Sequence, residues 1–171
     1  MTETSDTTPE TALTENLDAL VAELLTHRRL TVATAESCTG GLLSKRLTDT
    51  PGASAYFAGG VIAYSARVKS SLLGVDPGLI AEKGVVCREV ALAMADGVRI
   101  KLGADIGLGT TGLAGPDGDG SDLAPGTVFV ALSAAGASHC LELHLDFDRG
   151  GVRDAASSHA LEMLRLYLLA L

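Results

Sequence analysis

Tryptophan is absent from this sequence, and aromatic residues of all kinds make up only 4% of it. The interior must therefore be filled mainly by alanine, leucine, valine and glycine. Because these side chains are small, helices and strands have to approach one another closely if no voids are to remain. The 171 residues are enough for one domain with a sizeable core.

Basic residues are also scarce. The chain has 13 Lys and Arg against 21 Asp and Glu, which gives a formal net charge of −8. This balance argues against a nucleic-acid partner, because binding to a duplex depends mainly on Lys and Arg contacts to phosphate. A small anionic ligand remains compatible with it, because such a ligand responds to the local field rather than to the total charge.

Cysteine is limited to Cys38, Cys87 and Cys140, and no two of them form a CxxC pair. The four histidines also lack the spacing of metal ligands. We therefore expect neither a disulfide framework nor a metal site, and no cofactor. Unpaired cysteines favour a reducing, cytoplasmic location.

Long apolar runs are missing as well, since no segment approaches the roughly 20 residues needed to span a bilayer. The polar start MTETSDTTPETA does not have the pattern of a signal peptide. We expect residues 1–13 to form a disordered tail, residues 14–171 to form one domain, and no association with a membrane.

What is present is an alternation of helical and extended patterns. The predicted helices cover residues 14–29, 41–49, 66–73, 76–84, 88–102 and 152–171. The predicted strands cover 30–35, 57–65, 104–112, 127–134 and 140–147, and the last two form a hairpin. Leu141, Leu143, Leu145 and Phe147 should share the buried face of the final strand. This order predicts a three-layer α/β/α domain with a mixed β-sheet.

Three segments, "AESCTGG", "AYSARVK" and "TTGLAGPDG", end predicted strands with polar or glycine-rich sequence. Ligands of open α/β sheets bind at the carboxyl ends of strands, so these segments are the candidate site.

The first segment leads through Gly40 and Gly41 into a helix, whose first backbone N–H groups can bind an anion or a developing oxyanion. Either Ser37 or Cys38 could be a nucleophile there. Elementary chemistry favours Cys38, because a helix N-terminus lowers a thiol pKa. Alternatively, Thr39 caps the helix and the glycines only pack it against the sheet.

The other segments also allow two interpretations. Lys69 is either a solvated charge or a desolvated base that activates serine. The hydroxyls of Thr110 and Thr111 lie beside a glycine-rich loop that could cradle phosphate or simply turn. Arg149 and Arg153 stand at the start of the last helix, where the dipole opposes them, and they are either ligand-binding groups or surface charges.

Taken together, "AESCTGG", "GGVIAYS…K", "GADIGL…TGLAGPDG", "GTVFVAL" and "DRGGVR" resemble the C-terminal domain family of competence-damage-inducible protein CinA. The likeness runs from about Leu17 to the C-terminus. Stand-alone members of this family include nicotinamide mononucleotide deamidase. The resemblance implies a metal-free amidohydrolase that converts this pyridine mononucleotide and water into nicotinate mononucleotide and ammonia.

The resemblance also implies roles for individual residues. Ser37 matches the nucleophile, Lys69 the base and Thr111 a supporting hydroxyl. The positions that match the substrate pocket are Glu36, Thr39, Gly40, Gly41, Tyr64, Gly112, Arg149 and Arg153, of which the two arginines are expected to meet the substrate phosphate. The family thus selects Ser37 over Cys38.

Several residues depart from the family pattern: Ala66 and Arg67 replace an amide and an acid, Cys87 a serine, and Leu123 a lysine. They leave two alternatives open, namely a non-catalytic nucleotide-binding or partner module and a serine amidohydrolase for another small amide. The last helix has six leucines in LEMLRLYLLAL, which is more leucines than a single apolar stripe can hold. We therefore expect a homo-oligomer.

Overall fold

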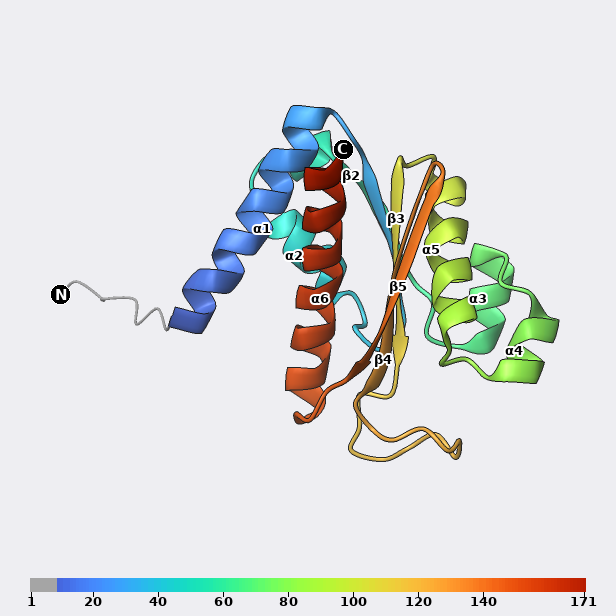
Figure 1. Ribbon diagram of the computed structural model, residues 1–171. Helices are drawn as coiled ribbons and strands as arrows, with labels where there is room; N and C mark the ends of the chain where they lie inside the picture. Colours follow the sequence, from blue (N-terminus) through green and yellow to red (C-terminus); the bar gives the residue numbers. More distant parts are fainter. Residues whose placement is uncertain (1–8) are drawn as a thin grey trace.

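The computed structural model describes residues 9–171, with side chains described from Leu17 onward. Five strands form one sheet between two layers of helices (Figure 1). The strand order is β2-β1-β3-β4-β5, with β2, β1 and β3 parallel and the remaining pairs antiparallel. The strands are β1 (Val32–Glu36), β2 (Phe57–Ile62), β3 (Ile106–Gly112), β4 (Thr127–Ala134) and β5 (Ala137–His144). The single α/β/α domain with a mixed sheet is therefore confirmed.

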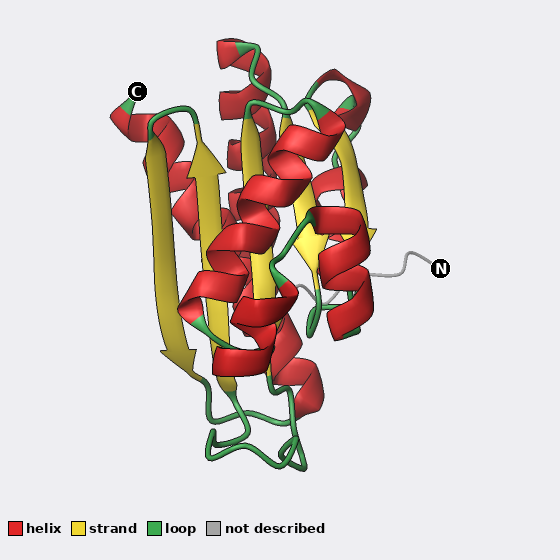
Figure 2. Cartoon of the chain, turned by 90° about the vertical axis from the view of Figure 1, so that its right-hand side faces the viewer, coloured by secondary structure: helices red, strands yellow, loops and turns green. Residues whose placement is uncertain are grey.

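The helices divide between the two faces of the sheet. One face is covered by α1 (Pro9–Arg28), α2 (Leu42–Asp49) and α6 (Arg149–Ala170). The other is covered by α5 (Arg88–Leu102), with α3 (Ala66–Leu73) and α4 (Pro77–Lys83) packed beside it (Figure 2). A short 3₁₀ turn, Ala53–Ala55, precedes β2.

Close packing of small residues brings these layers together, as the composition predicts. Gly97 faces α3, and a Cβ built on it would lie 2.0 Å from the carbonyl oxygen of Leu73. Gly60 of β2 faces α2, and a Cβ there would lie 2.5 Å from the Ser44 hydroxyl. These two glycines allow α3 and α2, which flank the candidate site, to approach α5 and the sheet.

Most element boundaries match the sequence-based expectations. Helix α3 is capped by the Ser65 hydroxyl and ends at Gly74, whose φ is +71°.

Helix α1 begins at Pro9, so residues 9–13, which we predicted to be part of a disordered tail, lie in this helix. Residues 1–8 of that tail lie outside the described residues. None of the helices within residues 9–171 combines the length and apolar character needed to cross a membrane.

The prediction for the last strand was partly wrong. Strand β5 starts at Ala137 and ends at His144, about three residues earlier than expected. Leu143 and Leu145 pack against the core, but Leu141 is 47% exposed and Phe147 is 64% exposed. The reason is position: β5 is the edge strand of the sheet, and Phe147 lies beyond it, in the segment that leads to α6.

Candidate active site

The candidate site lies where β1 and β3 end, beside the turn from β2 into α3. This end of the sheet also receives the start of α6 and the loop between β3 and β4, at the bottom of Figure 1. Strands β1, β2 and β3 are parallel neighbours, so their carboxyl ends share one edge of the sheet. The three sequence segments are therefore brought together, as expected for ligand sites in open α/β sheets.

The buried carboxylate of Glu36 organises the turn between β1 and α2. Its Oε2 accepts hydrogen bonds from the Thr39 hydroxyl (2.7 Å) and from the backbone amides of Gly41 (2.9 Å) and Leu43 (3.1 Å). Its Oε1 accepts from the amide (2.7 Å) and hydroxyl (2.5 Å) of Ser44. Glu36 and Thr39 thus shape the turn with their polar atoms already bonded, instead of presenting them to a ligand.

This arrangement corrects our expectation that amides at the Gly-Gly turn hold an oxyanion. The Gly41, Leu43 and Ser44 amides are used by Glu36, and the Gly40 and Leu42 amides donate to the carbonyls of Ser37 and Thr39. Within the described part of the chain, the turn amides without a backbone or carboxylate acceptor are those of Cys38 and Thr39, and both lie near the Cys38 sulfur.

Ser37 and Lys69 meet directly. The Lys69 Nζ lies 2.9 Å from the Ser37 Oγ and donates a second hydrogen bond of 2.7 Å to the carbonyl oxygen of Ala63. Lys69 is 1% exposed, and Ser37 is 8% exposed. The amine is therefore held between a fixed acceptor and the serine hydroxyl, in a place that bulk water barely reaches.

Burial changes the pKa of the Lys69 amine and of the Cys38 thiol. Desolvation lowers the pKa of Lys69 from 10.5 to about 8, since removal from water disfavours the charged ammonium. The same effect raises the pKa of the Cys38 thiol to about 11, against the opposing pull of nearby backbone amides and Lys69. About half of Lys69 is thus neutral at pH 8 and about a tenth at pH 7, whereas Cys38 stays protonated and weakly nucleophilic.

Thr111 lies in β3 next to Thr110, and the alternation of a strand sends their side chains to opposite faces of the sheet. The Thr110 hydroxyl bonds to Thr39 on the α2 side (2.8 Å). The Thr111 hydroxyl donates to the carbonyl of Val85, in the segment before α5 (2.8 Å). Gly112 follows, and a Cβ there would lie 2.7 Å from the carbonyl oxygen of Thr127, so its role is close backbone packing.

Arg149 and Arg153 connect the start of α6 to the other segments of the site. Arg149 donates to the carbonyl of Gly115 (2.8 Å) and to the hydroxyl of the exposed Tyr64 (3.3 Å). Arg153 donates to the carbonyl of Thr39 (2.9 Å) and passes close to Gly40. The two guanidinium groups therefore lie at this edge of the sheet, bonded to neutral acceptors and without a carboxylate partner among the described residues.

Sequence reasoning missed several contributors. The carbonyls of Ala63 and Val85, which bind Lys69 and Thr111, carry no side-chain signal at all. Ser44 could have been found, because a hydroxyl in the first turn of a helix often takes part in capping. Within residues 17–171, no group of three or more His, Cys, Asp or Glu side chains is placed to hold a metal ion.

Comparisons with known proteins show the family to which this chain belongs. The model of the CinA C-terminal domain matches residues 14–168. A CinA-like protein of Geotalea daltonii is 49% identical over 158 residues, which cover 91% of this chain and 38% of that protein. A CinA-like protein of Myxococcus xanthus is 48% identical over 153 residues, which cover 89% of this chain and 36% of that protein. The chain thus spans little more than a third of the length of these relatives.

Solved structures of similar length have the same fold. A CinA superfamily protein from Klebsiella pneumoniae superposes with a TM-score of 0.89 at 30% identity, covering 92% of this chain and 99% of that one. The competence/damage-inducible protein CihA from Agrobacterium tumefaciens gives a TM-score of 0.86 at 35% identity, with coverage of 91% and 94%. On the family match and these relatives, the chain belongs to the CinA C-terminal domain family.

Proposed function

We propose that this protein is an amidohydrolase that deamidates nicotinamide mononucleotide to nicotinate mononucleotide and ammonia, as part of pyridine nucleotide recycling. The observation that carries the proposal is the 2.9 Å contact between the buried Lys69 amine and the Ser37 hydroxyl. A serine beside a lysine of lowered pKa is an activated nucleophile, since the neutral amine can accept its proton. Family membership supports the choice of an amidohydrolase.

In the first chemical step, the neutral Lys69 accepts the Ser37 proton while the Ser37 oxygen attacks the carboxamide carbon. The Ala63 carbonyl binds one N–H of the amine and so directs its lone pair toward the hydroxyl. The protonated Lys69 then gives this proton to the departing nitrogen, which leaves as ammonia, and an acyl ester remains on Ser37. Water attacks the ester with Lys69 again accepting a proton, which then returns to Ser37.

The tetrahedral intermediate needs donors for its oxyanion. Because Glu36 and local carbonyls use the other amides of the turn, we assign this role to the Cys38 and Thr39 amides, one of which directly follows the nucleophile. Donors of this kind are typically worth about 3–4 kcal/mol each in acyl transfer. The Thr111 hydroxyl donates to the Val85 carbonyl and forms no hydrogen bond with Ser37 or Lys69 in the described residues, so we assign it only the role of an acceptor for an N–H of the departing ammonia.

The phosphate of the substrate would bind Arg149 and Arg153. Both have guanidinium groups at this edge of the sheet, and phosphate is a better partner for them than the neutral oxygens they contact now. The exposed Tyr64 ring stands beside Arg149 and can flank the pyridine ring. The two arginines can thus attract an anion locally, although the net charge of the whole chain is −8.

A direct assay separates this function from its alternatives. Purified protein should release ammonia from nicotinamide mononucleotide without added metal, and it should release none from nicotinate mononucleotide, which lacks the amide. Free nicotinamide should be a poor substrate, because it has no phosphate for the arginines. Binding of the mononucleotide without turnover would instead support a non-catalytic module. Turnover of another small amide, with the mononucleotide inert, would support a serine amidohydrolase of different specificity, the alternative that Ala66 and Leu123 suggest.

We also propose that the protein is a cytoplasmic homo-oligomer. Leu161, Leu164 and Leu168 of α6 are buried, but Leu166, Leu169 and Leu171 are each more than half exposed. Leu166 and the exposed Leu141 of the edge strand line one groove, and this apolar groove is the surface that a second copy would cover. The cysteines at positions 38, 87 and 140 are free, which fits a reducing compartment.

A further inference from the structure

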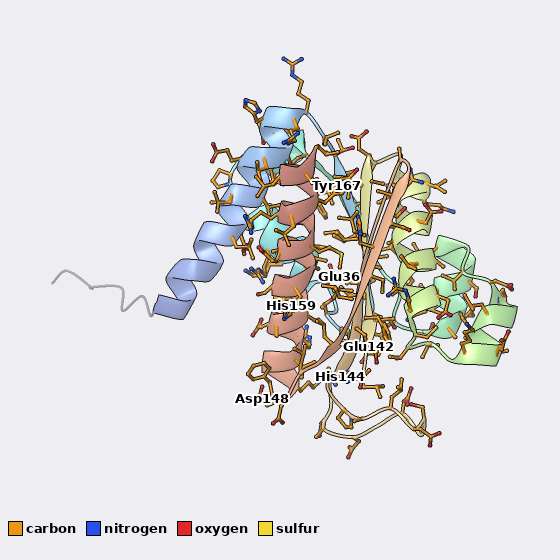
Figure 3. All side chains as sticks on the ribbon, in the orientation of Figure 1. Glu36, Glu142, His144, Asp148, His159 and Tyr167 are labelled. Carbon is orange, nitrogen blue, oxygen red and sulfur yellow. The ribbon has the colours of Figure 1, made fainter. Side chains whose placement is uncertain are left out.

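Glu36 is a buried acid without a cation. Its side chain is 0% exposed, and no Lys, Arg or His among the described residues forms an ion pair with it. A carboxylate in such a place is tolerated only when donors replace the water it has lost. Five donors do so here, three backbone amides and two hydroxyls. In Figure 3 the labelled Glu36 lies in the interior, where the layer of α2 and α6 meets the sheet.

The donors show what the carboxylate does. Helix α2 begins after Gly41, which has a φ of +97° and no side chain to cap the helix. The amides at the start of a helix lack partners inside the helix, and they form the positive end of its dipole. Glu36 supplies the missing acceptor from outside, at the end of β1. It is thus the N-terminal cap of α2, reaching over the turn that contains Ser37.

The backbone of Glu36 is also linked to both residues of the proposed dyad: Ser37 follows it in the chain, and Lys69 is connected to it through Ala63. Its own carbonyl accepts a 2.7 Å hydrogen bond from the Ala63 amide, and the Ala63 carbonyl accepts from Lys69. On the other side, the Ser37 amide is fixed to the carbonyl of Thr110 (3.0 Å). The turn from 36 to 41 is therefore anchored at the strand, at the helix and at the segment that holds the lysine.

We infer that Glu36 is a positioning residue, whose charged carboxylate holds the Ser37 hydroxyl in line with the Lys69 amine. The inference rests on the proposed Ser37–Lys69 dyad, but it does not depend on the identity of the amide substrate. The carboxylate never meets substrate in this account. Its effect appears in the reactivity of Ser37 and in kcat, because displacement of a reacting group by about 1 Å can cost as much as 100-fold in rate.

The test is the rate at which Ser37 is labelled by an alkyl fluorophosphonate, followed by intact-protein mass at a temperature where every variant is folded. Glu36→Gln keeps the shape but turns an amide NH₂ toward backbone donors. We expect labelling to slow by about 10- to 100-fold. The kcat for nicotinamide mononucleotide should fall in parallel, while KM stays within about threefold of the wild-type value. A purely structural role would lower the melting temperature and leave the labelling rate of the folded molecules at the wild-type value.

Asp105→Asn is the matched control, because Asp105 likewise accepts from a backbone amide and a hydroxyl, those of Thr31, but at the opposite end of β1. It should leave Ser37 labelling unchanged. If Glu36→Gln does not fold, Ser44→Ala removes one of the five donors and should slow labelling by a few-fold in the same direction. A wild-type labelling rate in folded Glu36→Gln, or in Ser44→Ala where Glu36→Gln does not fold, would overturn the inference. Labelling of wild type without deamidation would reject the substrate and keep the inference, whereas no labelling of wild-type Ser37 would reject the dyad and the inference with it.

Discussion

Replacement of Ser37 by alanine is expected to lower the rate of ammonia release from nicotinamide mononucleotide by about 10⁶-fold, the order of magnitude found when the serine nucleophile of an acyl-transfer enzyme is removed. The physical reason is that no other group can form the acyl ester. Lys69 would lose its 2.9 Å partner, and the amine would have no hydroxyl to deprotonate. The measurement is a coupled ammonia assay, with circular dichroism to show that the variant is folded.

Cys38→Ala is the control for this prediction, since Cys38 is the adjacent residue and elementary chemistry favoured it as a nucleophile. Its thiol is buried, and its pKa is raised to about 11, so hardly any thiolate exists near neutral pH. We expect Cys38→Ala to retain activity within about tenfold. The opposite pattern, an active Ser37→Ala and an inactive Cys38→Ala, would identify the thiol as the nucleophile.

Replacement of Lys69 by methionine has the second largest expected effect. Methionine approximates the length of the lysine stem but cannot accept a proton, so the reaction loses its general base. We expect the rate at pH 8 to fall by about 10²- to 10⁴-fold with KM little changed, because Lys69 contacts Ser37 and Ala63 rather than the phosphate site. A loss confined to KM would place Lys69 in binding instead of catalysis.

The same variant should have a pH-dependent effect on stability. The pKa of Lys69 is lowered from 10.5 to about 8 in the folded protein, so the unfolded chain binds this proton more tightly. Stability attributable to Lys69 therefore rises with pH between about 8 and 10.5 and is lowest below that window. The stability of Lys69→Met minus that of wild type, as free energy of unfolding, should therefore be larger at pH 7 than at pH 10 by about 2–3 kcal/mol, because wild type carries the cost of the buried ammonium at pH 7. Urea titrations at the two pH values measure this difference, and a constant difference would show that burial does not perturb the lysine.

Local patterns were sufficient to predict most of the fold. Ser65 as a cap and Gly74 as a stop bounded α3 correctly, because capping and positive φ are properties of a few neighbouring residues. The final strand was less predictable, because alternation shows which residues share a face but cannot show whether a helix covers that face. Leu141 and Leu143 share one pattern in the edge strand β5, yet Leu143 packs against the core and Leu141 is exposed.

The site was predictable to a similar degree. The carboxyl-end rule for α/β sheets gathers Ser37, Lys69 and Thr111 at one edge, and the structure brings the first two into contact. The state of the amides at the Gly-Gly turn was not predictable. Whether an orphan amide binds a ligand or an internal carboxylate depends on how a side chain folds back across the turn, as Glu36 does. Such a bond leaves no periodic trace in the sequence.

The pH dependence of kcat/KM in the wild-type protein tests the proposed chemistry most directly. If a buried, neutral Lys69 removes the Ser37 proton, kcat/KM should rise with pH and reach half its maximum near pH 8, where the lowered pKa of this amine lies in the free protein. The alkyl fluorophosphonate should label Ser37 with the same midpoint, in the absence of substrate. A midpoint near the ordinary lysine pKa of 10.5, or rates that do not change between pH 6 and pH 10, would contradict the account.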